Sequence, residues 1–204
     1  SGTGNDFARG LGIPHGNTEA AIRHLEAALQ HPQPRVVDLM KVSWQDEGEA
    51  VVRLVAGSLS AGFDAIVNDR ANRMRRPKGP SRYTIAMLAE LLALNPLAYR
   101  VVLDGEVVTE RALMVSVGNN SSLGGGMRFA PDAVMDDGLL DVMIVKPLSR
   151  IAFLRIFPRV FSGTHTTDPR VVMRRAARIR IEVDAAITAY ADGERMGPLP
   201  VDIE

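Results

Sequence analysis

The spacing of apolar residues changes once along the chain, near residue 35. Within residues 17–30, Ile22, Leu25 and Leu29 recur at helical spacing behind Asn17, and two prolines follow the segment. Asn is a good helix N-cap and proline cannot continue a helix, so the pattern predicts an amphipathic helix over 17–30. A shorter helix is expected to begin at Phe7.

After residue 35 the apolar residues alternate with polar ones or form short runs, which is typical of strands. The predicted strands are 35–44 and 50–55, which form a hairpin, then about 98–103, 106–109, 111–118 and 139–145, and short strands between 171 and 203. The predicted helices are 63–75, 82–95 and 149–161. The predicted fold class is therefore α+β and mainly β, a β-sandwich-like domain with attached helices.

Composition narrows the classes of partner. Lys and Arg balance Asp and Glu at 24 each, and the chain has no Cys. No global charge therefore drives binding to nucleic acid, and disulfides are excluded. No apolar run approaches the roughly 18 residues of a membrane span.

The first candidate site is the Gly-rich start of the chain. Gly2 and Gly4 allow a turn whose backbone N–H groups converge on one point, and Asn5 or Asp6 can cap the helix that follows. A loop that leads into a helix N-terminus can bind an anion such as phosphate. The alternative is an ordinary turn before a helix.

Three groups of carboxylates are further candidates. Asp192-Gly193-Glu194 and Asp104-Gly105-Glu106 share the same letters, and Asp-Gly favours a hairpin turn in both. Asp136 and Asp137 precede a glycine and an apolar strand, where paired acids either bind a hard cation or form a solvated turn. Asp38 stands in an apolar run, where an unpaired carboxylate is costly, although a strand-edge acid facing solvent is equally compatible.

Two other groups of polar residues are less specific. The segment 69–82 is basic and fits either a solvated helix end or a patch for anionic lipid headgroups. Its basic residues are Arg70, Arg73, Arg75, Arg76, Lys78 and Arg82. The histidines have no metal-ligand spacing and are interpreted as surface residues. They are His15, His24, His31 and His165.

Four segments, in order, resemble the diacylglycerol kinase and sphingosine kinase family of lipid kinases. They are the string from Gly2 to Arg9, Gly62-Phe63-Asp64-Ala65, the stretch from Pro131 to Val142, and Asp192-Gly193-Glu194. The resemblance covers the whole chain. It implies that residues 1–34 are the remnant of a nucleotide-binding domain and that residues 35–204 are the β-rich lipid domain that completes the active site. One departure is Ser58-Leu59-Ser60-Ala61, where the family has an Asn in an apolar strand.

The resemblance also implies a reaction and its residues. The longer enzyme would transfer the γ-phosphate of ATP to a lipid hydroxyl, most simply that of diacylglycerol or a relative, with ATP and Mg²⁺ as cofactors. Glu194 matches the general base, and Asp6 and Asp38 match the acids around the magnesium of the nucleotide. A second magnesium site matches the Asp137 carboxylate with the carbonyls of Val134 and Leu139, beside Asp136. The phosphate contacts match Gly2, Thr3, Gly4 and Asn5.

The expected setting is cytoplasmic and peripheral, at the inner face of the membrane where the lipid substrate lies. Nucleic acid is not an expected partner, and a homodimer is an open alternative. The chain alone is expected to be inactive without the upstream domain. The rival interpretations are a non-catalytic β-sandwich that binds a lipid or an anion, and an enzyme related to NAD kinases.

Overall fold

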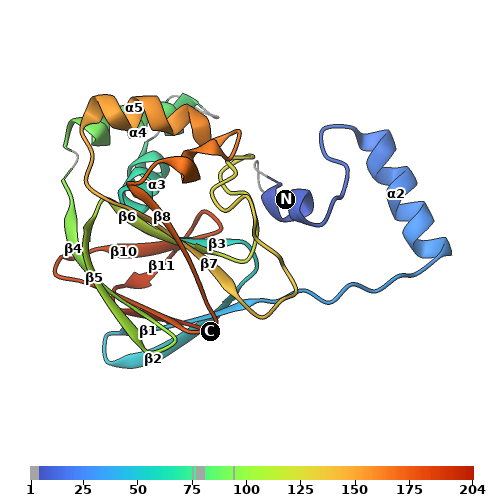
Figure 1. The fold of residues 1–204 in the computed structure, drawn as a ribbon. Helices are drawn as coiled ribbons and strands as arrows, with labels where there is room; N and C mark the ends of the chain where they lie inside the picture. The colour runs from blue at the N-terminus through green and yellow to red at the C-terminus, as the bar shows by residue number, and fades with distance from the viewer. Residues whose placement is uncertain (1–4, 75, 77–80, 94) are drawn as a thin grey trace.

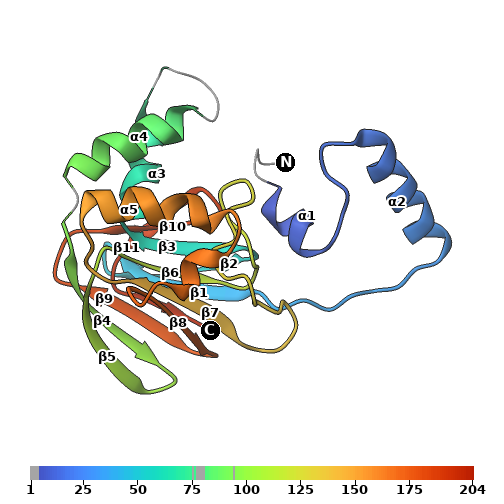
Figure 2. The same cartoon turned by 45° about the horizontal axis from the view of Figure 1, so that its top comes forward.

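The chain folds into a β-sandwich with helices on one side. The computed structural model describes residues 5–74, 76, 81–93 and 95–204, with only the backbone for 81–84. Two antiparallel six-stranded sheets pack face to face, and helices cover the outer face of the second sheet (Figures 1 and 2). This arrangement confirms the predicted fold class.

The two sheets divide the strands as follows. The first sheet has the order β2 (Glu49–Val55), β1 (Met40–Asp46), β12 (Val201–Ile203), β9 (Ile179–Val183), β4 (Leu97–Leu103) and β5 (Glu106–Ala112). The second has the order β11 (Glu194–Pro198), β10 (Thr188–Ala191), β3 (Ser58–Gly62), β6 (Met114–Gly118), β7 (Leu140–Val145) and β8 (Val171–Ala176). The predicted hairpin of 35–44 and 50–55 is β1 and β2, although β1 begins only at Met40.

Burial follows from this layering. In β1, Met40, Val42 and Trp44 are buried and alternate with more exposed residues, because only one face of the first sheet meets the core. Strand β7 is buried along its whole length, because it has the first sheet on one face and the helical layer on the other. The apolar core between the sheets therefore holds the strand ends in fixed positions.

Three helices form the layer over the second sheet. They are α3 (Phe63–Arg73), α4 (Ser81–Leu92) and α5 (Arg150–Ile156). Two short 3₁₀ helices follow α5, η1 (Phe157–Val160) and η2 (Thr164–Thr167). The helix predicted over 149–161 is thus split, because Pro158 lacks the N–H that an α-helix needs but fits the first turn of η1.

Two helices precede the sandwich, α1 (Asp6–Gly10) and α2 (Thr18–Gln30). The Asn17 side chain accepts a hydrogen bond from the backbone N–H of Ala20 at 3.0 Å, which confirms the predicted cap of α2. Its apolar residues remain uncovered: Ile22, Leu25 and Leu29 are 51%, 58% and 71% exposed. In both views α2 stands away from the sandwich (Figures 1 and 2).

In the part of the chain that the structure describes, no helix combines the length and the apolar character that crossing a bilayer requires.

Candidate functional site

The turn before Glu194 is fixed by its own aspartate. Asp192 and Gly193 join β10 to β11 with φ angles of 49° and 85°, the positive values of a two-residue hairpin turn. The Asp192 carboxylate accepts hydrogen bonds from the backbone N–H groups of Gly57 at 3.1 Å and Ser58 at 2.9 Å. Glu194 is exposed at the start of β11, so its carboxylate reaches solvent from a well-anchored turn.

The other Asp-Gly-Glu triplet is built in the same way in the first sheet. Asp104 and Gly105 join β4 to β5 with φ angles of 49° and 94°. The Asp104 carboxylate accepts from the backbone N–H groups of Ala177 at 3.1 Å and Arg178 at 2.8 Å. Both triplets are therefore hairpin turns, as predicted, and only their surroundings distinguish them.

A pair of buried asparagines connects the Asp192 turn to other candidate residues. Asn119 and Asn120 follow β6 and are 0% exposed. The backbone N–H of Asn119 donates to the carbonyl of Gly57 at 3.0 Å, and its side-chain amide donates to the carbonyl of Asp38 at 2.6 Å. The side-chain amide of Asn120 donates to the carbonyl of Asp6 at 2.8 Å. These residues were missed in the sequence, where two adjacent amides after an apolar strand were the available signal.

Asp38 lies just before β1, and not within a strand as expected. Its backbone N–H donates to the carbonyl of Met135 at 2.7 Å, and its carboxylate accepts from the N–H of Gly138 at 2.8 Å. These bonds offset the desolvation of the half-buried carboxylate. They also hold Asp38 directly against the loop that contains Asp137.

The Asp137 side chain pairs with an arginine of the neighbouring strand β8 in a solvent-accessible contact. Its carboxylate accepts from the N–H of Leu139 at 3.1 Å and forms an ion pair with Arg175 of β8. This hydrogen-bonded ion pair with Arg175 lowers the pKa of Asp137. Arg175 also lies 3.7 Å from the carboxylate of Asp141, which is buried in β7 and whose pKa is raised by that burial.

The donor set of this loop fits a weakly held hard cation. Among the described residues, no group of three His, Cys, Asp or Glu side chains could hold a metal ion. The carbonyls of Val134 and Leu139 accept no hydrogen bond from any described residue, so they are available beside the Asp137 carboxylate. One carboxylate, two carbonyls and water are acceptable ligands for Mg²⁺. Asp136 is exposed and forms no hydrogen bond with the described residues.

Asp6 joins α1 to the Gly-rich loop after β6. Its carboxylate accepts from the N–H groups of Gly125 and Gly126, both at 2.7 Å, with Arg9 3.8 Å away. The cap predicted from Asn5 or Asp6 is wrong: Asn5 occupies the N-cap position with φ 51°, and no side chain caps the helix. The predicted phosphate contacts Gly2, Thr3 and Gly4 lie outside the described residues.

Ser60 of β3, within the stretch where the sequence departs from the family pattern, takes part in a polar cluster with Asp64 of α3. The carboxylate of Asp64 accepts from Ser116 at 2.9 Å and is also hydrogen-bonded to Ser60. Burial raises the pKa of Asp64, although both serines oppose this effect. Ser60 thus supplies a hydrogen bond to the Gly62–Ala65 motif.

Two interpretations from the sequence change with the structure. Within the basic segment, Arg70 pairs with Glu90 and Arg73 pairs with Asp69 at 2.8 Å, so the charges of these two arginines are compensated locally. Arg75, Lys78 and the Arg82 side chain lie outside the described residues. His165 is not a surface residue: it is 1% exposed, and its ring contacts the carbonyl of Phe129 at 3.1 Å.

Hydrogen bonds thus connect the Asp192 turn, Asp38, the Asp137 loop and, through the adjacent Asn120, Asp6, and we call this connected set the rim of the sandwich. The family described as "YegS C-terminal NAD kinase beta sandwich-like domain" matches residues 57–204. The chain belongs to this family. A relative of this YegS-type chain, a diacylglycerol kinase of Mycobacterium tuberculosis, is 42% identical over all of the chain and 63% of the relative. A diacylglycerol kinase of Bacillus subtilis is 26% identical over 98% of the chain and 62% of the relative.

Solved structures agree on the fold. A putative diacylglycerol kinase from Bacillus anthracis superposes with a TM-score of 0.67 at 24% identity, over all of this YegS-type chain and 64% of that one. The lipid-kinase resemblance found in the sequence is therefore confirmed at the level of family. The chain spans less than two thirds of the length of these relatives.

The two Asp-Gly turns allow a matched test of the rim. Asp192→Asn and Asp104→Asn keep a residue that tolerates positive φ but leave one acceptor oxygen in place of two. Each change is expected to lower the free energy of unfolding by about 1 kcal/mol in urea titrations. Only Asp192→Asn is expected to lower the activity of the longer protein, by about tenfold or more, because it loosens the turn before Glu194. Equal activity of the two variants would contradict a role for that turn.

Proposed function

We propose that the chain is the C-terminal part of an ATP-dependent lipid kinase that phosphorylates the hydroxyl of diacylglycerol or a related lipid. One observation carries the proposal. A continuous series of hydrogen bonds runs from the Asp192 turn through Gly57 and Asn119 to Asp38 and the Asp137 loop. This series supports the proposal because it links the turn before Glu194 to Asp38 and the Asp137 loop, which come from distant parts of the sequence and which the resemblance assigns to one site.

The proposed chemistry assigns each group one task. Glu194 accepts the proton of the lipid hydroxyl as that oxygen attacks the γ-phosphorus of ATP, and ADP leaves. Asp6 and Asp38 would orient water around the metal of the nucleotide, and Asn5 with Gly2, Thr3 and Gly4 would hold the phosphates. Mg²⁺, when bound, neutralises charge on the phosphates. Asp137, Val134 and Leu139 are the residues that would hold a second ion, which would stiffen the loop against Asp38.

The division into domains is part of the proposal. Residues 1–34 belong to the nucleotide-binding domain, and residues 35–204 form the lipid domain. The uncovered apolar face of α2 supports this boundary, because such a face is normally buried against another element. The proposed location is cytoplasmic, at the inner face of the membrane.

The direct test is an assay of the protein with its full natural sequence. It is incubated with ATP, Mg²⁺ and diacylglycerol in mixed micelles, and the lipids are separated to detect phosphatidic acid. Phosphorylated lipid supports the proposal. ATP or lipid binding with no phosphorylated product would favour the non-catalytic sandwich, and phosphorylation of NAD in place of lipid would favour the NAD kinase-like interpretation.

Asp137→Asn is expected to raise the Mg²⁺ concentration that gives half-maximal activity by about tenfold, because the loop loses its one anionic ligand. Arg175→Gln is expected to shift the same curve toward lower Mg²⁺, because Arg175 competes for the Asp137 carboxylate. Mg²⁺-dependent thermal stabilisation of the protein gives a second reading of the same affinity. Asp136→Asn is the control and should leave both curves in place. If Asp137→Asn does not shift the dependence of activity on Mg²⁺ concentration, the loop is an ordinary turn and not a cation site.

A further inference from the structure

The segment that contains α5 is unusual in charge. From Lys146 to Thr167 the sequence has no Asp or Glu, but it has Lys146, Arg150, Arg155 and Arg159. The chain as a whole is balanced. A strongly basic stretch that forms a continuous surface would therefore attract an anionic partner locally.

Helix α5 also exposes apolar side chains that a core helix would bury. Its Phe153 and Ile156 are buried, and Phe153 packs against Phe63 of α3 with ring centroids 5.1 Å apart. On its other side, Ile151 and Leu154 are 64% and 47% exposed. These two side chains are therefore left largely open to solvent on the outer side of α5.

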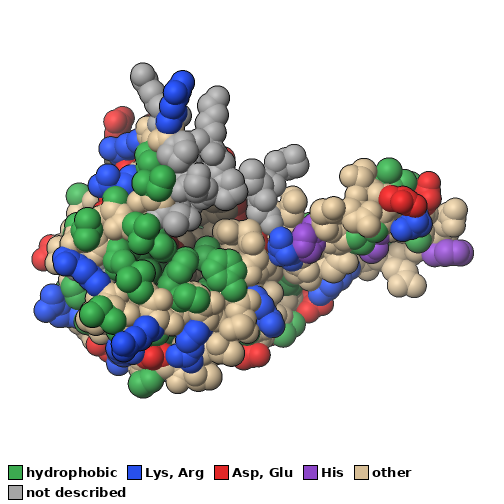
Figure 3. Space-filling view, turned by 90° about the horizontal axis from the view of Figure 1, so that it is seen from above, with side chains coloured by type: hydrophobic (Ala, Val, Ile, Leu, Met, Phe, Trp, Pro, Cys, Tyr) green, Lys and Arg blue, Asp and Glu red, His purple; other side chains and the backbone are tan. Residues whose placement is uncertain are grey.

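Neighbouring elements extend the open apolar face. Arg150 donates a hydrogen bond to the carbonyl of Leu92, which places the start of α5 beside the end of α4. The large exposed apolar residues of α4, α5 and the loop after η1 form what we call the α4–α5 face. They are Ile85, Leu88, Leu92, Ile151, Leu154 and Phe161. Seen from above, hydrophobic side chains gather on this side of the molecule with Lys and Arg around them (Figure 3).

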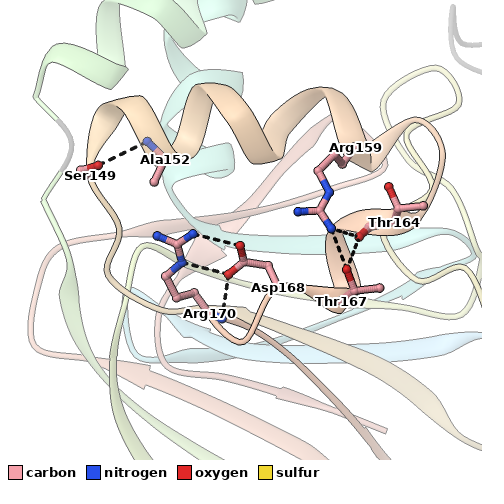
Figure 4. Close-up of polar contacts among 7 residues, drawn as sticks. All are labelled: Ser149, Ala152, Arg159, Thr164, Thr167, Asp168 and Arg170. Carbon is pink, nitrogen blue, oxygen red and sulfur yellow. Dashed lines mark hydrogen bonds and ion pairs between the residues drawn. The ribbon is translucent and has the colours of Figure 1, made fainter.

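The arginines around the face lack a direct ion-pair partner within the described part of the chain. Arg150, Arg155 and Arg159 form no ion pair with a described carboxylate. The nearby Asp168 is neutralised by Arg170 through two contacts of 2.9 Å (Figure 4). The electrostatic contrast with the segment around α3 is clear, since Arg70 and Arg73 there are paired with acids.

Local contacts hold the face in this form. Ser149 caps α5 by accepting from the N–H of Ala152 at 3.3 Å (Figure 4). Arg159 donates to the carbonyl of Thr164 and to the hydroxyl of Thr167, both at 2.6 Å, and so ties η1 to η2 (Figure 4). Phe157 stacks on Phe153 with centroids 5.7 Å apart. The exposed apolar residues therefore stand on a preformed surface.

We propose that the α4–α5 face docks on an anionic lipid bilayer, with its apolar side chains entering the interface and the exposed Arg150 and Arg155 meeting the headgroups. Apolar area supplies affinity and basic residues supply selectivity for anionic lipid, which is the arrangement of interfacial membrane-binding helices. The proposal rests on the proposed function for its role in catalysis, because a lipid substrate lies in the membrane. Its physical basis is the charge and exposure of the face alone.

The test is co-sedimentation of the protein of full natural length with vesicles. Phosphatidylcholine vesicles are compared with vesicles that also contain phosphatidylglycerol, across a salt series. Ile151→Gln together with Leu154→Gln is expected to weaken binding to the anionic vesicles by at least about tenfold, because two exposed apolar groups no longer leave water. Arg155→Gln is expected to weaken it about fivefold at low salt, with the difference fading at high salt.

The matched control is Val52→Gln with Leu54→Gln. These residues are 52% and 67% exposed on β2, far from the helical layer (Figure 1). Vesicle binding that is equal in the control and in the α5 variant would overturn the proposal. The proposal would also be overturned if wild-type protein did not bind vesicles and the α5 variant had a different oligomeric state, because the face would then bind a second copy of the chain.

Phosphorylation of a short-chain, water-soluble diacylglycerol separates the two proposals. Wild-type protein and the α5 variant should phosphorylate it equally. If both do so but neither prefers anionic vesicles, the docking face is wrong and the kinase proposal stands. If neither protein phosphorylates the soluble lipid while wild type alone binds vesicles, the kinase proposal is wrong and the docking face stands.

Discussion

Replacing Glu194 by Gln in the protein of full natural length is expected to lower the rate of lipid phosphorylation by about 10²–10⁴-fold. The amide keeps the shape of the side chain but cannot take the proton of the attacking hydroxyl at neutral pH. Since the exposed Glu194 side chain forms no hydrogen bond with a described residue, the fold should be unaffected. The apparent affinity for ATP should therefore stay close to that of wild type, as measured by initial rates against ATP concentration.

Glu106→Gln is the internal control for this change. Glu106 follows an Asp-Gly turn with the same backbone geometry, but that turn is bonded to Ala177 and Arg178, apart from the rim that holds Asp38. Its activity should equal that of wild type. Equal losses in the two variants, or none in either, would show that Glu194 is not the base.

The second large effect concerns the chain taken alone. Residues 1–204 are expected to show no turnover of ATP, with or without lipid, whereas the protein extended to the length of its relatives should be active. Under the proposed function the chain would supply the base and the cation loop, but it covers only 63% of its Mycobacterium tuberculosis relative. Under the proposed division of domains, most of the surface that binds ATP lies outside it.

Paired assays of both proteins, with circular dichroism to verify that each is folded, provide the measurement. Comparable ATP turnover by the two would contradict the division into a nucleotide domain and a lipid domain. Activity in neither protein, with both folded, would contradict the kinase assignment itself.

The local features of the fold were accessible from the sequence. Alternating apolar residues predicted most strands of both sheets, and the two Asp-Gly turns follow from the tolerance of Asp and Gly for positive φ. The cap at Asn17 is equally local. Such features depend on residues that are a few positions apart, so the sequence contains what is needed to predict them.

The connections across the rim depend on topology and were not accessible. Asn119 contacts Gly57 and Asp38, and Arg175 contacts Asp137, only because the sheet order brings distant segments together. Apolar spacing also could not show that the outer side of α5 stays open. It gives the period of a helix but not which side another element covers.

The open stripe of α2 has a consequence for any sample of this chain by itself. The three exposed apolar side chains on one face of α2 are expected to bind other apolar surfaces, including those of further copies of the chain. Light scattering or gel filtration of residues 1–204 would then measure nonspecific self-association through α2 and not the native oligomeric state. The oligomeric state of the protein therefore has to be read from the longer polypeptide, or from a variant in which Leu25 and Leu29 have been made polar.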